Sequence, residues 1–211
     1  MKVAFMLLLV FVSASLCAQQ TATTKDGKEV ILNEDGTWKF VIDVDGLPID
    51  TTSVKILTKP TNSQKLIKSE RNNFGVWYNE KKWLKSDFSA NSLAEFQLIN
   101  QGKFPEVFCM IINERVEGFF DMLKNMVIEN AKKSCTDFEL YKQEIRTINQ
   151  IKVLHLIFGG KIQGMQVKYF GYYATTETGI TQLVLFTTKN LFNSYEKDFE
   201  DFANGLVLVN E

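Results

Sequence analysis

Few residues of this chain have the types and spacing that catalysis requires. His155 is the only histidine in the sequence, whereas hydrolytic triads and most transition-metal sites need an imidazole oriented by a second group or joined by other ligands. Its chain neighbours Leu154 and Leu156 are apolar, and so are Val153 and Ile157, which share its face of a strand. We therefore expect His155 to be a packed or edge histidine rather than a base or a ligand.

The cysteines offer either a nucleophile or a bridge. Cys109 lies in the most apolar run of the chain, where burial would raise the thiol pKa and make it inert. If the chain ascends a strand and returns along a helix, Cys109 and Cys135 end level with each other, which permits a disulfide in an oxidising compartment. The alternative is two separate buried thiols, because the lateral distance between them cannot be read from the sequence.

A run of four acidic residues could in principle hold a calcium ion. It consists of Glu196, Asp198, Glu200 and Asp201. Helical spacing scatters these carboxylates around a solvated face, whereas calcium sites usually need a loop that makes the ligands converge. We predict neither a metal site nor a cofactor here.

Aromatic residues are the feature that points to binding. Trp77, Trp83, Tyr172 and Tyr173 belong to a group of aromatics too large for one face of one strand to bury, and tryptophan and tyrosine suit partly exposed binding surfaces. One hypothesis is a patch or cleft lined by these four residues that contacts a protein, peptide or glycan. The alternative is that they form a second core under the helices.

The elements that would position these residues begin at Phe74. Strands are predicted over residues 74–78, 94–100 and 106–113, and the last two should pair antiparallel across a turn at Gly102. The best helical pattern follows over residues 118–133, with apolar residues at three- and four-residue spacing, so it should lie on a sheet face.

The last third of the chain, residues 151–211, is its largest apolar block. After a partly solvated strand over residues 138–147, it continues the sheet with strands over 165–173 and 181–187. A final helix is expected to open near Asn190 or Asn193, where Asn193 and Glu196 make a capping-box-like pair, and to stop at Asn204-Gly205 before a short strand. This order predicts an α+β fold with an antiparallel sheet flanked by helices.

Several stretches together resemble a known architecture. They are FGVWYNEKKW, the apolar strand that leads through E-R-V-E into a helix, the pair GYY-x5-G-x-x-Q-L-V, and TKNLFNSYEKDFEDFANGL. In these it is similar to exported bacterial domains that share the fold of PsbP, an extrinsic subunit of photosystem II. The resemblance covers residues 74–211 and implies an α/β/α sandwich, without a catalytic motif.

The region before residue 74 is expected to contain three parts. Residues 1–18 combine Lys2 with an apolar run and small residues, the pattern of a secretory signal peptide cleaved after Ala18. Lipidation of Cys17 is the weaker alternative, since Leu16 is not the small residue that a lipobox wants. Residues 19–42 predict a small β-meander with two Asp-Gly turns, and residues 43–73 predict a linker with at most one short strand.

The meander has its own resemblance and its own requirement. The run ATTKDGKEVILNEDGTWKF is similar to a short module near the start of many exported bacterial proteins, a module without known activity. Three strands this short barely stand alone in water, so they should pack on the main domain or on another copy in a homo-oligomer.

Composition narrows the function class. A formal net charge of −1 disfavours nucleic-acid and anionic-membrane binding, both of which need a basic face. Beyond residues 1–18 there is no apolar run long enough to cross a bilayer. The sequence thus predicts an exported, periplasmic or extracellular, non-catalytic binding or assembly module of the bacterial envelope. The alternative is an envelope enzyme or small-molecule carrier that uses carboxylates such as Glu114 and Glu117.

Overall fold

A computed structural model describes residues 20–23, 25, 29–32, 38–40, 50–86, 91–101, 107–116 and 120–209. The predicted signal peptide, its cleavage site and Cys17 lie outside the described residues. The chain divides into two compact units, Met1–Val41 and Ile42–Glu211. Within the described ranges, neither helix is long and apolar enough to cross a membrane.

The first unit contains three short antiparallel strands in the order β1-β2-β3. They are β1 (Gln20–Thr23), β2 (Glu29–Leu32) and β3 (Trp38–Phe40). Each strand pairs with the next one along the chain, as in a meander.

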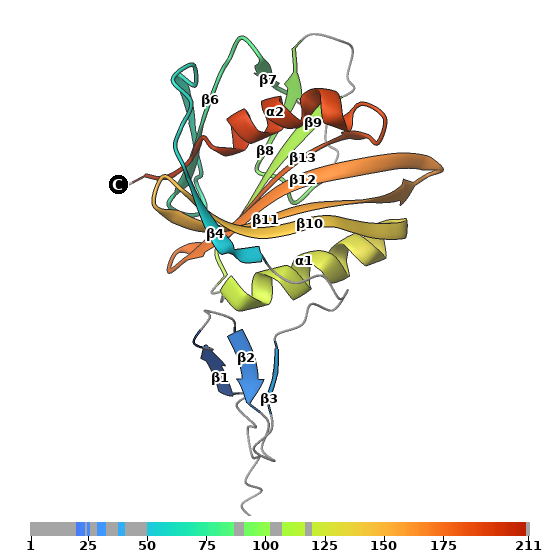
Figure 1. Ribbon diagram of the computed structural model, residues 1–211. Coiled ribbons are helices and arrows are strands. Elements are labelled where there is room, and N and C mark those ends of the chain that lie inside the picture. The colour runs from blue at the N-terminus through green and yellow to red at the C-terminus, as the bar shows by residue number, and fades with distance from the viewer. Residues whose placement is uncertain are drawn as a thin grey trace, which may run out of the picture. The chain divides into compact units, whose positions relative to one another are not determined.

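The second unit is built on an eight-stranded sheet (Figure 1). Its strands, in spatial order, are β4 (Asp50–Leu57), β10 (Thr136–Ile148), β11 (Ile151–Ile162), β12 (Met165–Thr176), β13 (Gly179–Thr188), β9 (Val107–Glu114), β8 (Phe96–Asn100) and β7 (Trp83–Lys85). A smaller sheet has the order β14 (Leu206–Leu208), β6 (Phe74–Tyr78) and β5 (Lys65–Lys68). The helices are α1 (Phe120–Ser134) and α2 (Phe192–Ala203).

The large sheet is mixed, which corrects the prediction of a purely antiparallel sheet. Strand β4 runs parallel to β10, with Lys55 opposite Arg146, while the other neighbouring pairs are antiparallel. Strand β10, the pairing partner of β4, lies far along the chain, so no hairpin signal marks β4 in the sequence.

The region predicted as a linker, residues 43–73, contains two strands among its described residues. Residues 50–57 and 65–68 form β4 and β5 and belong to the second unit. Ile56 is 76% exposed at the sheet edge, so this apolar residue of β4 is not a core residue. The polar stretch around Pro60 then hides β5, whose one fully buried residue is Ile67.

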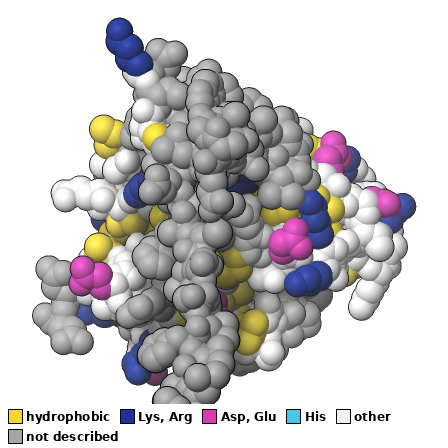
Figure 2. All heavy atoms as spheres, turned by 90° about the horizontal axis from the view of Figure 1, so that it is seen from below, with side chains coloured by type: hydrophobic (Ala, Val, Ile, Leu, Met, Phe, Trp, Pro, Cys, Tyr) yellow, Lys and Arg dark blue, Asp and Glu magenta, His cyan; other side chains and the backbone are white. Residues whose placement is uncertain are grey.

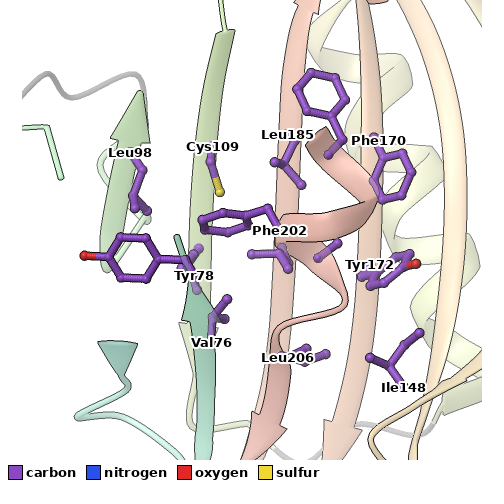
Figure 3. Packing of buried hydrophobic residues seen from close by; sticks show 14 of the residues in the cluster. Val76, Tyr78, Leu98, Cys109, Ile148, Phe170, Tyr172, Leu185, Phe202 and Leu206 are labelled. Atoms are coloured by element: carbon purple, nitrogen blue, oxygen red, sulfur yellow. The ribbon is translucent and has the colours of Figure 1, made fainter. Parts of the chain in front are cut away.

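One hydrophobic core lies on each face of the large sheet. In Figure 1, α2 lies above this sheet and α1 below it. The small sheet and α2 pack with the upper face, where Phe202 and Tyr172 lie among buried aliphatic residues (Figure 3). Leu123 and Val127 of α1 pack against Leu154, Tyr173 and other residues of the opposite face.

The start of α2 differs from the predicted capping box. Leu191 is the N-cap residue and makes no side-chain cap hydrogen bond, and the helix begins at Phe192. Phe192 is 0% exposed. Burial of this ring therefore fixes the helix start before Asn193, which is exposed.

Candidate functional site

One hollow among the described residues is polar and open to solvent. Its volume is about 500 Å³, within the range of small-molecule sites. The lining residues come from the β5–β6 loop, the end of β9, the β12–β13 turn and the segment after β14: Lys68, Ser69, Glu70, Arg71, Asn72, Asn73, Arg115, Thr178 and Val209. The hollow thus lies near the end of the chain that Figure 1 marks with C.

The Glu95 carboxylate holds the β5–β6 loop in place. It accepts hydrogen bonds from Ser69 Oγ at 2.8 Å and from the Glu70 backbone N–H at 2.7 Å. It also accepts one from Asn113 Nδ2 at 2.8 Å, and Asn113 Oδ1 accepts one from Thr181 Oγ1 at 2.6 Å. Asn113 and Thr181 are buried, so Glu95 links the loop to buried residues of β9 and β13 in the large sheet.

The remaining backbone N–H groups of this loop are also satisfied by side chains. Ser69 Oγ accepts hydrogen bonds from the N–H groups of Arg71 and Asn72, and Asn72 Oδ1 accepts one from Phe74. Thr178 Oγ1 accepts one from the N–H of Asn73 at 3.2 Å. The wall of the hollow is therefore preformed, since local side chains fix its backbone.

Two guanidinium groups complete the wall. Arg71 Nη1 donates to the carbonyl oxygens of Leu93 and Asn113, both at 3.2 Å. Arg115 donates through Nε to the carbonyl oxygen of Arg71 at 2.6 Å and through Nη2 to that of Glu70 at 2.7 Å. Neither arginine forms an ion pair with a carboxylate in the described part of the chain, so both positive charges are offset only by carbonyl dipoles.

The opposite rim is a hydroxyl and amide cluster. Asn73 Oδ1 accepts hydrogen bonds from Thr176 Oγ1 at 3.0 Å and from Thr178 Oγ1 at 2.6 Å. Asn72 Nδ2 donates to the carbonyl oxygen of Ile180 at 3.1 Å. These bonds tie the loop to the β12–β13 turn and use much of the hydrogen-bonding capacity of both asparagines.

The predicted aromatic patch does not exist as a single surface. Trp83, Tyr172 and Tyr173 are 2%, 0% and 1% exposed, and only Trp77 is half-buried. Tyr172 packs on the α2 side of the sheet and Tyr173 on the α1 side, because neighbouring residues of a strand point to opposite faces. The alternative hypothesis of core residues is the one that the structure supports.

Two of these residues have specific roles in packing. The Trp83 ring lies 4.7 Å from that of Phe202. The Tyr172 hydroxyl accepts a hydrogen bond from Arg146 Nη1 at 2.5 Å and donates one to Asn204 Oδ1 at 3.1 Å. Burial raises the pKa of Tyr172 well above its ordinary range, and the positive charge of Arg146 offsets part of the rise.

The cysteines are separate thiols, which is the second of the two alternatives that the sequence left open. Cys109 is buried in the core on the α2 side, and Cys135 is half-buried just after α1 on the other side of the sheet. Figure 3 shows Cys109 among Leu98, Leu185 and other core residues. Burial raises the pKa of both thiols, most strongly that of Cys109.

The other candidates for chemistry are engaged in structure. His155 is 0% exposed, and its Nδ1 lies 3.1 Å from the carbonyl oxygen of Gly171. In the acidic run, Asp198 pairs with Lys82 at 2.5 Å and Glu200 with Arg146 at 2.9 Å. The described residues contain no cluster of three or more histidine, cysteine or acidic residues placed to hold a metal.

Glu114, one of the two carboxylates of the enzyme alternative, does not line the hollow. Glu114 is half-buried and accepts a hydrogen bond from Gln182 Nε2 at 3.3 Å, while Glu117 lies outside the described residues. The residues that do line the hollow were missed because Arg71 falls in the predicted linker and Arg115 in a predicted turn. Their only sequence signal is the polar run Ser69–Asn73, which is typical of a side-chain-capped turn.

The face of the molecule seen in Figure 2 has no uniform charge. Among the described residues it carries lysine and arginine as well as aspartate and glutamate side chains, interspersed with hydrophobic ones. A basic surface of the kind that binds nucleic acid is not visible on the described part of this face.

Comparisons with known proteins place the fold but not a family. A scan against protein-family models finds no match, and a search of curated proteins finds none either. Among solved structures, cyanobacterial PsbP (CyanoP) from Synechocystis sp. PCC 6803 is similar with a TM-score of 0.51 and 11% identity, over 71% of this chain and 94% of that chain.

Two further structures have lower TM-scores. A protein of unknown function from Pseudomonas aeruginosa, described as a putative regulator, has a TM-score of 0.47 and 14% identity over 70% of this chain and 98% of that one. The Ran-binding protein Mog1p from Saccharomyces cerevisiae has a TM-score of 0.47 and 8% identity over 69% and 95%. The likeness to CyanoP confirms a PsbP-like fold, and a likeness at this identity shows the fold alone.

Proposed function

We propose that this chain is an exported, non-catalytic binding module of the bacterial envelope, and that the polar hollow beside the β5–β6 loop is its binding site. The observation that supports binding is the preformed wall, in which the Glu95 carboxylate and the Ser69 hydroxyl fix the loop before any ligand arrives. Because such a site is already ordered, binding a ligand costs less conformational entropy. The leader-like pattern of residues 1–18 supports export.

The groups best suited to catalysis support a non-catalytic role. His155 and Cys109 are buried in the core and do not line the hollow. Burial also raises the pKa of the Cys109 thiol, which disfavours the reactive thiolate. The lining instead offers guanidinium, amide and hydroxyl groups, which are groups that bind and orient.

A small-molecule carrier is the second candidate, and the size of the hollow favours it. About 500 Å³ would accommodate a compact metabolite, and the same lining would also receive one group of a larger partner. The two candidates differ in what stays bound, a low-mass ligand or a macromolecule.

The test is capture from the native envelope with a matched pair of variants. An affinity tag belongs between residues 18 and 19, because Val209 lines the hollow and a C-terminal tag would crowd it. Lys68 and Lys81 are both exposed, but only Lys68 lines the hollow. We expect a partner, identified by mass spectrometry after crosslinking, to be kept by the natural chain and by Lys81→Glu and lost from Lys68→Glu.

Other results have definite meanings. A low-mass ligand in native mass spectrometry, without a protein or glycan partner, would favour the carrier. Equal capture by both variants would contradict the hollow as the binding site. Retention of the chain in the cytoplasmic fraction would contradict the envelope role.

A further inference from the structure

The ligand class of the hollow follows from which donors its wall leaves available. Five consecutive backbone N–H groups, those of residues 70–74, are all donated to side-chain oxygens. Phosphate sites in proteins typically use a run of such N–H groups at a turn or a helix start. In this loop that run is already used, so a ligand must be held by side chains.

Besides the exposed Lys68 ammonium, the available charged donors belong to the two arginines. Arg71 uses only Nη1, and Arg115 uses Nε and Nη2, each toward backbone carbonyl oxygens. Among the described residues, no partner is recorded for Nε and Nη2 of Arg71 or for Nη1 of Arg115. Because one edge of each guanidinium is anchored, its planar group is oriented before a ligand binds.

From these observations we propose that the hollow binds a carboxylate group, with Arg71 and Arg115 as the residues that contact it. This inference rests on the proposed function of the hollow as a binding site. A planar guanidinium matches a planar carboxylate through parallel N–H···O hydrogen bonds. The carboxylate comes either from a small organic acid or from a peptide C-terminus or acidic side chain.

Two further charged side chains, of opposite sign, lie at the rim of the hollow. Lys68 adds a third positive charge to the lining, whereas Glu70 places a carboxylate beside the same hollow. Both side chains are exposed, and neither makes a hydrogen bond or an ion pair within the described residues. They can therefore be changed without loss of a contact that holds the fold.

The experiment is an NMR titration of the full chain at constant ionic strength, adjusted with sodium chloride. The probes are acetate, its neutral isostere acetamide, inorganic phosphate, and trialanine with either a free or an amidated C-terminus. We expect acetate to shift the backbone resonances of residues 70–73 and the Nε–H resonances of Arg71 and Arg115, and acetamide to leave them unchanged. Free trialanine should bind more tightly than acetate if the source is a peptide, and no more tightly if it is a small acid.

Variants separate a binding role from a structural one. Lys68→Gln should weaken acetate binding about twofold to fivefold, and Glu70→Gln should strengthen it by a similar factor, as expected for exposed charges. Arg115→Lys keeps the charge but loses the fork and should weaken binding at least about tenfold. Lys81→Gln is the matched control and should bind acetate as the natural chain does. If Lys68 and Glu70 had only a structural role, their substitutions would not change the affinity for acetate in opposite directions.

Three results would overturn the inference. These are tighter binding of phosphate than of acetate at equal ionic strength, equal shifts with acetamide, and affinities that change in the same direction in the Lys68 and Glu70 variants. If acetate fails while envelope capture still depends on Lys68, the carboxylate inference is wrong and the proposed function stands. If acetate binds and capture does not depend on the hollow, the inference stands and the partner role of the hollow is wrong.

Discussion

The substitution Tyr172→Ala gives the sharpest test of the core assignment. Tyr172 is 0% exposed, and its ring lies 5.3 Å from that of Phe170 and 5.2 Å from that of His155. Truncation of a buried aromatic side chain to alanine costs about 3–5 kcal/mol, because it removes transfer free energy and leaves a cavity. The change also leaves the buried Arg146 without one acceptor.

The magnitude can be checked by thermal and chemical unfolding. For a unit of this size, each kcal/mol shifts the Tm by about 2–4 °C, so Tyr172→Ala should lower the Tm by about 6–20 °C. Urea unfolding followed by circular dichroism should give the matching loss in the free energy of unfolding. An exposed aromatic patch would predict almost no change.

Tyr172→Phe is the matched control, because it keeps the ring and removes only the hydroxyl. That hydroxyl accepts from Arg146 and donates to Asn204, and a hydrogen bond to a charged group contributes about 1.5–3 kcal/mol. The expected order of stability is therefore natural chain, Tyr172→Phe, Tyr172→Ala. A free energy of unfolding for Tyr172→Ala within about 0.5 kcal/mol of the natural value would refute the core assignment.

Three further measurements probe other parts of the second unit. Gly205→Ala would place a Cβ atom 1.8 Å from the carbonyl oxygen of Trp77, so calorimetry should show destabilisation of about 1–3 kcal/mol; an unchanged Tm would contradict this close approach. Cys135 should react with a thiol reagent in the folded protein and Cys109 only on unfolding, as mapped by peptide mass spectrometry, because Cys109 is 1% exposed; a Cys109–Cys135 peptide isolated without reductant would contradict separate thiols. Burial raises the pKa of Tyr169 from 10.0 to about 12. Above pH 10 the unfolded state therefore releases this proton first, and the free energy of unfolding falls as pH rises toward 12. Tyr169→Phe should reduce that fall in urea titrations, and an identical pH dependence in both proteins would contradict the shift.

The central strands of the second unit could be predicted because the local sequence of each strand indicates that it is buried. The strands β9 and β13 are nearly continuous apolar runs, since α2 and α1 cover the two sides of the sheet. Strand β4 has no such run, because its place at the edge leaves Ile56 exposed. Its status as a strand depends on pairing with β10, about ninety residues further along the chain, which no local pattern reports.

The aromatic patch was wrong for a reason that the sequence already contained. Tyr172 and Tyr173 are consecutive in a predicted strand, and the period of two sends them to opposite faces. They could not have lined one surface without a bulge between them, and their pairing with His155 and Leu154 is regular. The correct inference from this pair was that both faces of β12 are covered.

The candidate site divides in the same way between local and distant information. The turn chemistry of Ser69 and Asn72 is local, and serine and asparagine side chains commonly accept hydrogen bonds from N–H groups two or three residues later. What the sequence does not carry is the meeting of this turn with Glu95, Arg115 and Thr178, at separations of 25, 44 and 105 residues for the contacts that join them. Those contacts exist because β5, β9 and the β12–β13 turn end at the same side of the second unit. The side-chain hydrogen bonding that fixes the loop can thus be predicted from residues 69–73. The charge of the wall, and with it the proposed ligand, depends on which distant residues the fold brings to this loop.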